Sequence, residues 1–276
     1  MRDIGISIVT YSPNLAELSA TLSSLRNAAQ IAIEAGRISS VQLYLIDNGP
    51  GDQWTERLEA LCRAQWSEAG CSKWEVLCPG QNLGFGLAHN LAIDRSSGEY
   101  HLVLNPDVTL ANDALLNAVD YMDKHPEVGC LSPYAEGKAR KREYLCKQPP
   151  SVLVLILRGF APAFLRKLFD KKLAAYEMRG VTENDVVQSV PIASGCFMFF
   201  RTNTLKTVGG FSPKYFLYFE DFDLSLRVSK TSAISYVPMV KVVHTGGYAS
   251  KKGLTHIRMF ASSGRTFFGE HGWRWI

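Results

Sequence analysis

Apolar segments and helical stretches alternate over the first 110 residues. Strands are predicted at residues 4–11, 41–46, 75–77 and 101–104, and their largely apolar character is expected of strands buried on both faces. Helices are predicted between these runs, at about 14–36, 52–68 and 84–95. The first helix opens on Asn14 and Glu17, a pair that resembles a capping box. This alternation predicts an α/β fold, with a mostly parallel central sheet flanked by helices.

Polar residues follow two of these strands directly. Asp47-Asn48-Gly49 comes after the second strand, and Asn105-Pro106-Asp107 comes after the fourth. Ligands of such sheets bind at the carboxyl ends of the strands. The carboxylate of Asp107 suits Mg²⁺ or Mn²⁺ shared with diphosphate oxygens, although an Asp after Asn-Pro is also a common turn residue. Asp47 precedes Asn-Gly, so turn formation explains it equally well.

A glycine-rich loop, Asn82-Leu83-Gly84-Phe85-Gly86, precedes the third predicted helix, and Asn90 lies one turn into that helix. Glycines allow close backbone approach, and a helix N-terminus favours phosphate. The same loop also fits simple helix entry. It is not the G-x-G-x-x-G fingerprint, so the pattern does not favour a nicotinamide-binding site.

The second half of the chain combines strands with an acidic cluster. Its predicted strands lie at 197–200, 234–237 and 240–243, and a helix is predicted at 255–269. Four aromatic residues lead into the acidic cluster, and they are Tyr215, Phe216, Tyr218 and Phe219. The cluster itself contains Glu220, Asp221 and Asp223. Carboxylates enclosed by aromatic rings have raised pKa values and serve as general bases.

Two further residues join these candidates. Arg227 lies four residues after Asp223, so the two can form an ion pair on one helix face, which is a structural role. His244 ends an apolar strand; a lone histidine is usually structural. Together with Asp107, however, its imidazole would complete a cation site.

Composition narrows the class of protein. The 276 residues are 46% apolar and 20% charged, which is ordinary for a globular protein. A net charge of +4 gives no reason to expect a nucleic-acid partner. The longest apolar runs, 152–157 and 196–200, are far shorter than the roughly 18 residues of a spanning helix, and no signal peptide is expected. The six cysteines form no C-x-x-C pair, which predicts free thiols in a reducing cytoplasm.

Basic and apolar residues are interleaved between positions 138 and 172. The ten basic residues are Lys138, Arg140, Lys141, Arg142, Lys147, Arg158, Arg166, Lys167, Lys171 and Lys172, against only Glu143 and Asp170. Such a segment suits the interface of an anionic membrane. A solvated basic face over an ordinary core is an equal alternative.

In combination these segments resemble the family 2 glycosyltransferases of the GT-A fold, and most closely the bacterial rhamnosyltransferases of polysaccharide and O-antigen assembly. The resemblance runs from about residue 4 to 270. The matching segments are Val9-Thr10-Tyr11-Ser12-Pro13, Ile46-Asp47-Asn48-Gly49, Asn82 to Gly86 with Asn90, Leu104-Asn105-Pro106-Asp107, Ser194-Gly195-Cys196, Gly209-Gly210-Phe211, Phe216 to Arg227, and His244. Each motif is weak alone, but eight in this order are specific to the family.

The resemblance implies a role for each matching position. The donor-binding residues would be Thr10, Tyr11, Asp47, Asn82, Gly84, Asn105 and Asp107, with Asp47 accepting a hydrogen bond from the pyrimidine base. Asp107 and His244 would bind a divalent cation, Mg²⁺ or Mn²⁺. Asp221 would be the catalytic base, Glu220 would orient the acceptor or the base, and Asp223 with Arg227 would support the acceptor side.

One position departs from the family's D-x-D pattern. Its first carboxylate is Asn105 here, as it often is in related rhamnosyltransferases. The substitution removes a negative charge, so metal affinity would rest on Asp107, His244 and the phosphates of the donor.

The resemblance also implies an organisation and a reaction. One domain, 1–276, would have a Rossmann-like nucleotide-sugar-binding half at 1–110, an acceptor and catalytic half at 111–250 and a C-terminal helix at 251–276. The enzyme would invert the anomeric centre while moving a sugar, L-rhamnose from its deoxythymidine diphosphate, onto a glycan or polyprenyl-diphosphate-linked glycan. It would be cytoplasmic, or peripheral on the inner face of the cytoplasmic membrane through 138–172.

Three other functions remain open at this point. The same fold also uses uridine diphosphate hexoses, and the family motifs barely separate the two donors. A catalytically silent nucleotide-sugar-binding protein is a second alternative, against which the intact Asp107, Asp221 and His244 argue. A sugar nucleotidyltransferase is disfavoured, because no glycine-rich loop bearing Arg and Lys follows the first strand.

Overall fold

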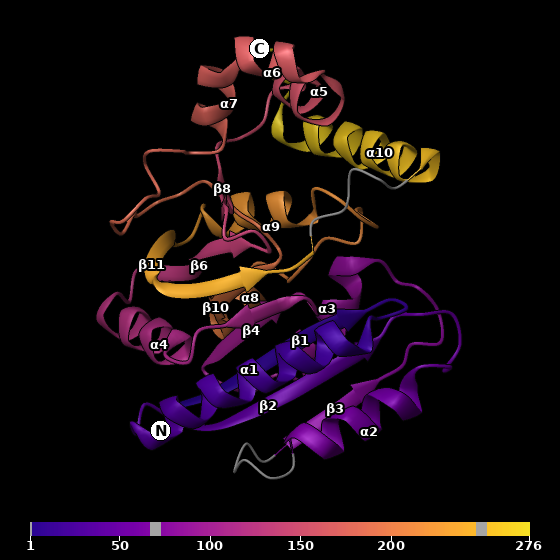
Figure 1. Cartoon of the computed structure of the whole chain (residues 1–276), viewed down its shortest axis with the longest axis vertical. Helices are drawn as coiled ribbons and strands as arrows, with labels where there is room; N and C mark the ends of the chain where they lie inside the picture. Colours follow the sequence, from indigo (N-terminus) through magenta and orange to yellow (C-terminus); the bar gives the residue numbers. More distant parts are fainter. Residues whose placement is uncertain (1, 67–72, 247–252) are drawn as a thin grey trace.

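A nine-stranded sheet runs through the computed structural model, which describes residues 2–66, 73–246 and 253–276 (Figure 1). The strand order is β3-β2-β1-β4-β10-β6-β11-β5, and β7 pairs with the C-terminal part of β6. The bounds are β1 Arg2–Thr10, β2 Ile38–Asp47, β3 Lys73–Leu77, β4 Tyr100–Leu104, β5 Val108–Leu110, β6 Val128–Gly137, β7 Arg142–Glu143, β10 Phe197–Arg201 and β11 Ala233–His244. A separate ribbon is formed by β8 (Cys146–Lys147) and β9 (Ile192–Ala193).

The predicted parallel pairing holds for the first four strands and for β6 with β11. Strands β10, β5 and β7 run antiparallel to their neighbours. The pair of β11 with β5 sets His244 opposite Val108, the residue after Asp107. Sheet register therefore brings together two candidate residues that are far apart in the sequence.

Helices cover both faces of the sheet (Figure 1). One face packs against α1 (Leu15–Glu34), α2 (Thr55–Trp66) and α4 (Ala114–Lys124). The other face packs against α3 (Phe85–Arg95), α8 (Thr202–Thr207) and α9 (Glu220–Val228). The predicted start of the first helix is confirmed, because the side chain of Asn14 accepts hydrogen bonds from the backbone N–H groups of Ala16 and Glu17.

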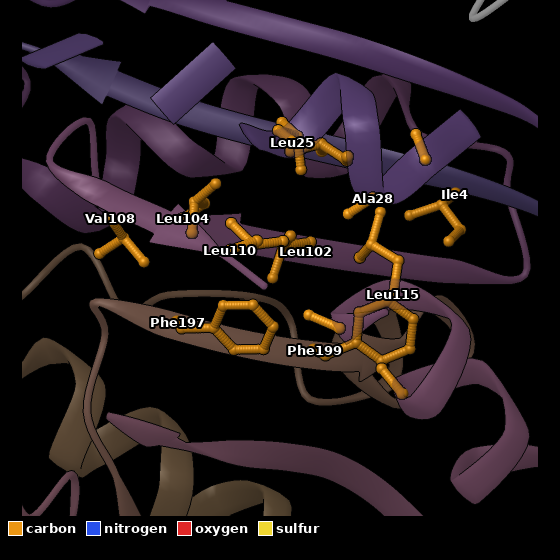
Figure 2. Close-up of a cluster of buried hydrophobic side chains, with 14 of the residues drawn as sticks. Ile4, Leu25, Ala28, Leu102, Leu104, Val108, Leu110, Leu115, Phe197 and Phe199 are labelled. Atoms are coloured by element: carbon orange, nitrogen blue, oxygen red, sulfur yellow. The ribbon is translucent and has the colours of Figure 1, made fainter. Parts of the chain in front are cut away.

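Alternation along the strands divides the core between these two faces. On β4, Leu102 and Leu104 point toward α1 and α4, whereas Val103 joins the cluster beneath α8 and α9. On β10, Phe197 and Phe199 share the first cluster (Figure 2). Because both faces of the central strands are buried, these segments are largely apolar, which is the pattern that predicted them.

Four more helices lie at one end of the molecule, beyond β8 (Figure 1). They are α5 (Val152–Phe160), α6 (Ala163–Leu168), α7 (Asp170–Tyr176) and α10 (Leu254–His271), the last close to its predicted range. None of the described helices combines the length and apolarity needed to cross a bilayer. The described cysteines, Cys62, Cys78, Cys130, Cys146 and Cys196, are free thiols; Cys71 lies outside the described residues.

Candidate active site

Asp107, His244 and Glu143 form one row of contacts at the edge of the sheet. Nε2 of His244 lies 3.5 Å from Oδ1 of Asp107, and Nδ1 of the same ring lies 2.8 Å from Oε2 of Glu143. Three strands supply the row, since Asp107 directly precedes β5, His244 ends β11 and Glu143 ends β7. The predicted pair of Asp107 and His244 is thus brought together, with a third residue added.

The backbone fixes the position of Asp107. Both the N–H group and the hydroxyl of Thr245 donate to the carbonyl oxygen of Asp107, at 2.8 and 2.9 Å. Gly246 follows so closely that a Cβ at this position would lie 1.7 Å from Oδ2 of Asp107. Only glycine leaves room for the carboxylate here.

The arrangement of these three side chains fits a divalent cation. Oδ1 of Asp107 is buried and has no hydrogen-bond partner among the described residues, and it faces Nε2 of His244. Histidines that bind metals commonly donate their second ring N–H to a carboxylate, which is the position of Glu143. Burial lowers the pKa of His244, but Asp107 and Glu143 outweigh it and raise the pKa to about 9. A cation bound to Nε2 would replace the proton that the two carboxylates otherwise retain.

Asp221 is held by backbone donors. Its Oδ2 accepts a hydrogen bond from the N–H group of Gly195 at 2.9 Å, and its Oδ1 accepts one from Phe222 at 3.0 Å. Burial raises the pKa of Asp221, while these bonds oppose the rise. A partly buried carboxylate with a raised pKa is suited to accept a proton.

The segment around Cys196 joins Asp221 to the row that contains Asp107. The N–H group of Asn105 donates to the carbonyl oxygen of Cys196, next to Gly195. Burial raises the pKa of the Cys196 thiol to about 12, and Asp107, Glu143 and Asp221 all contribute to the rise. The two candidate sites are therefore adjacent, on either side of this segment.

Glu220 lies almost fully inside the protein. It is 5% exposed, and its Oε2 has no hydrogen-bond partner among the described residues. Burial raises the pKa of Glu220, and the neighbouring charge of Asp221 adds to the rise. The two residues before it, Tyr218 and Phe219, have positive φ angles of 71° and 66°. Such strain in consecutive non-glycine residues is typical of functional sites.

Helix α10 packs against this strained segment. Tyr218 shares a 2.9 Å hydrogen bond with His256, and the hydroxyl of Tyr215 donates to Glu270 at 2.9 Å. The ring of Phe219 packs against Phe260 and Phe267. Three of the four aromatic residues that lead into the acidic cluster, Tyr215, Tyr218 and Phe219, therefore anchor α10.

Asp223 and Arg227 form the predicted ion pair, and it supports a turn. Nε of Arg227 donates to Asp223 at 2.8 Å, and its other nitrogens donate to the carbonyl oxygens of Val208 and Gly210. His271 of α10 contacts the second oxygen of Asp223 at 2.9 Å. The side chains of Asp223, Glu270 and His271 lie close enough together to hold a cation, but each already has a protein partner.

The predicted donor residues at the ends of β1 and β2 are mostly engaged within the protein. Thr10 is fully buried and donates to the carbonyl oxygen of Ile46 at 2.9 Å. Asp47 is 1% exposed and accepts from Gly49 and from the hydroxyl of Thr55. Tyr11 differs from both, because its side chain is 58% exposed. A direct contact of Asp47 with a base therefore stays a prediction.

Asn48 organises the glycine-rich loop. Its side chain donates to Asn82 and to the carbonyl oxygen of Gly84, and accepts from the N–H group of Leu83. Gly84 has a φ of 81°, and a Cβ there would meet the carbonyl oxygen of Phe216 at 2.2 Å. Sequence reasoning did not assign Asn48 a role, because Asn-Gly is also an ordinary turn.

The loop also joins the two halves of the chain. The N–H group of Phe85, at the start of α3, donates to the carbonyl oxygen of Phe216, so that donor is already used. Asn90 binds both the N–H group and the carbonyl oxygen of Phe211. The family-like segments around Asn82 and Gly210 are thus parts of one contact.

Two residues of the basic stretch were missed as site residues. Glu143, one of the two acids in that stretch, binds His244 as described above. Lys147 is 6% exposed and donates to the carbonyl oxygen of Tyr144. Burial lowers the pKa of Lys147 to about 8, and its charge acts on Asp221. The scarcity of acids around Glu143 was the only sequence signal for either residue.

Comparison with known proteins defines the class. The family model described as glycosyl transferase family 2 matches residues 6–209, so the chain belongs to this family and is a glycosyltransferase. It is similar to the N-acetylglucosaminyl-diphospho-decaprenol L-rhamnosyltransferase of Mycobacterium tuberculosis (strain ATCC 25618 / H37Rv), with 27% identity over 96% of this chain and 84% of the relative. It is also 27% identical to rhamnosyltransferase WbbL of Escherichia coli (strain K12), over 58% of this chain and 60% of that protein.

Solved structures share the fold. GalNAc-T7 with UDP, GalNAc and Mn²⁺ matches 89% of this chain and 44% of its own, with a TM-score of 0.60 and 15% identity. Residues 1–349 of S. aureus TarS in complex with UDP match 94% of this chain and 64% of their own, with a TM-score of 0.57 and 16% identity. The expected GT-A fold is thereby confirmed.

Proposed function

We propose that this family 2 enzyme transfers L-rhamnose from its deoxythymidine diphosphate donor to a hydroxyl group of a glycan or lipid-linked glycan. The observation that carries the proposal is the length of the likeness to the mycobacterial rhamnosyltransferase, which spans 96% of this chain and 84% of the relative. The name of that relative describes a polyprenyl-diphosphate-linked acceptor. The acceptor of this enzyme would accordingly lie at the inner face of the cytoplasmic membrane, with the enzyme peripheral to it.

In the proposed reaction, Asp221 takes the proton of the acceptor hydroxyl while that oxygen attacks the anomeric carbon. The bond from this carbon to the diphosphate oxygen breaks on the opposite side, so the configuration inverts. The Gly195 N–H group holds Asp221 in place, and the raised pKa of Asp221 suits a general base. Glu220, buried beside it, orients Asp221 or the acceptor.

Asp107 and His244 are the proposed ligands of a divalent cation, and Glu143 orients His244 through Nδ1. When bound, the cation would neutralise charge on the departing nucleoside diphosphate. The donor itself would bind along 1–110, with Tyr11, Asp47, Asn82, Gly84 and Asn105 lining its site and Thr10 supporting it from within the sheet. The acceptor would bind along 111–250.

A uridine diphosphate hexose is the second candidate donor. Its support is that the matching structures of TarS and GalNAc-T7 both contain UDP. Their identities of 16% and 15% extend only to the fold. The rhamnosyl donor is therefore preferred, since the relatives with higher identity are rhamnosyltransferases.

A donor panel in a thermal-shift assay tests the proposal. Deoxythymidine, uridine and guanosine diphosphates and their sugars are each added with Mg²⁺, with Mn²⁺ or with a chelator. A ligand at about 100 times its Kd stabilises the folded state by about 2.7 kcal/mol. We expect the deoxythymidine compounds to raise the Tm in a metal-dependent way. Asp107→Asn should weaken this shift, whereas Asp113→Asn, at an exposed site before α4, should not. A shift with the uridine compounds alone would show that the donor is a uridine diphosphate sugar. If none of the compounds shifts the Tm, the proposed donor site is refuted.

A further inference from the structure

Exposed apolar side chains gather on α5, α6 and the residues after α10. Ile156 and Phe160 on α5 are 51% and 59% exposed, and Phe164 and Leu168 on α6 are 70% and 74% exposed. Each pair is spaced by four residues, so its members share one face of their helix. Trp273 and Trp275 are 50% and 65% exposed, close in sequence to the C-terminus, which lies at the same end of the molecule (Figure 1).

Backbone hydrogen bonds attach the two tryptophans to α5. The N–H groups of Val152 and Leu153 donate to the carbonyl oxygens of Arg274 and Trp275, at 2.8 and 3.1 Å. The rings of Trp273 and Trp275 stack with centroids 5.1 Å apart, and Trp273 stacks on Phe268 of α10. The exposed indoles are therefore held in place beside the start of α5.

The exposed apolar face of α5 is separate from the face that α5 uses for folding. Val154 and Leu157 are buried against Leu173 and Tyr176 of α7. The protein thus satisfies the core with one side of α5 and leaves Ile156 and Phe160 in solvent. An apolar face without a folding role usually marks a contact with another molecule.

Exposed basic residues are interleaved along the chain with these apolar residues. They are Arg158, Arg166, Lys167, Lys171 and Arg274. The nearby acids are already paired, since Asp170 binds Arg179, and Glu177 binds Arg158 and Arg179. Cations interleaved with exposed Phe, Leu and Trp side chains match an anionic bilayer interface, where indole rings concentrate at the headgroups.

We infer that Ile156, Phe160, Phe164, Leu168, Trp273 and Trp275 form a docking surface for an anionic lipid bilayer, with the interleaved Arg and Lys residues on the headgroups. This membrane-docking surface differs from the stretch 138–172. Within that stretch Lys138 contacts Glu17 of α1, and Arg142 packs among Tyr134, Tyr144 and Tyr236, so the first ten residues lie elsewhere.

When the membrane-docking surface lies on the bilayer, the acceptor side of the enzyme faces the membrane. Tyr176 of α7 lies under the surface and is near enough to Asp221 for that charge to act on its hydroxyl. A sugar carried on a lipid diphosphate would then reach Asp221 without leaving the interface. This orientation rests on the proposed lipid-linked acceptor, whereas binding to the bilayer does not.

Vesicle flotation of the full chain tests the surface. We expect binding to vesicles rich in phosphatidylglycerol and little binding to pure phosphatidylcholine. Phe164→Ser with Leu168→Ser should reduce binding at least ten-fold, whereas Val186→Ser with Met239→Ser, at exposed positions beside and on β11, should not. Arg166→Glu with Lys167→Glu removes two attractions worth about five-fold each, and Lys124→Glu on α4 serves as its control.

Two further measurements separate the outcomes. Replacing Trp273 and Trp275 with Phe should remove a blue shift in fluorescence that appears when anionic vesicles are added. If wild-type protein ignores these vesicles, or forms dimers through the same residues in light scattering, the membrane-docking surface is refuted. All these variants should still transfer the sugar to a short water-soluble acceptor. If the wild-type protein fails to do so, the result counts against the proposed function and not against the membrane-docking surface.

Discussion

The two candidate sites are adjacent, but they are held together in different ways. His244 and Glu143 lie on strands of one sheet and Asp107 directly precedes β5, which pairs with β11, so sheet register brings the three residues together. Asp221 and Glu220 depend on a strained turn, a hydrogen bond from Gly195 and the packing of α10. The first site is part of the core architecture, whereas the second is assembled by loops and helices above it. Substitutions should therefore act on binding at the first site and on chemistry and stability at the second.

The largest expected effect is on turnover, through Asp221→Asn. Asparagine keeps an oxygen for the Gly195 N–H group but cannot take a proton at the required pKa. General base catalysis is worth about 10² to 10⁴ in rate, so kcat should fall by that factor. Initial rates and donor titrations measure the two effects separately, and donor affinity should change less than two-fold.

Asp113→Asn is the control for that substitution, because Asp113 is an exposed carboxylate before α4. It should leave both the rate and the donor affinity unchanged. Full activity of the Asp221→Asn protein would remove Asp221 from the mechanism and leave Glu220 as the remaining carboxylate to test.

A smaller effect is expected at the first site, through Glu143→Gln. Glutamine can still accept a hydrogen bond from Nδ1 of His244 but lacks the charge that orients and polarises the ring. Loss of such a partner typically costs 10 to 100-fold in metal affinity. Titration with Mn²⁺ in the presence of nucleoside diphosphate, followed by electron paramagnetic resonance, measures the change without requiring turnover.

Glu136→Gln is the matched control on the neighbouring strand, where Glu136 binds Tyr134 rather than His244. Equal losses in the two variants would mean that general electrostatics, and not the contact with His244, sets the affinity.

Most of the first half could be predicted from the sequence because its strands are largely apolar and because Asp47 and Asp107 lie where strands end. Position alone thus selected Asp47 and Asp107. The contacts of Asn48 with Asn82 and Gly84 were not predictable, because they join two loops that are 34 residues or more apart.

The second half was harder to predict for a physical reason. Glu143 and Lys147 acquire their roles only through pairing of β7 with β6 and of β8 with β9, and these strands are two residues long. Such short strands have no detectable hydrophobic period. The acidic cluster was recognisable, but the support given by His256, Glu270 and His271 depends on where α10 packs.

The smallest expected effect is a change in stability with pH, through Glu220. Burial raises the pKa of this carboxyl above its ordinary value of 4.5, so the folded protein binds the proton more tightly than the unfolded chain does. The resulting stability is fully present below about pH 4.5 and is lost as pH rises through the folded pKa. Glu220→Gln carries no ionisable group and should escape this loss. Its Tm should exceed that of the wild type by about 2–4 °C at pH 9, if about 1 kcal/mol is recovered, and the gap should close toward pH 5. Glu183→Gln, at an exposed carboxylate, should show no such gap, and a gap that is constant with pH would show that Glu220 is charged in the folded protein.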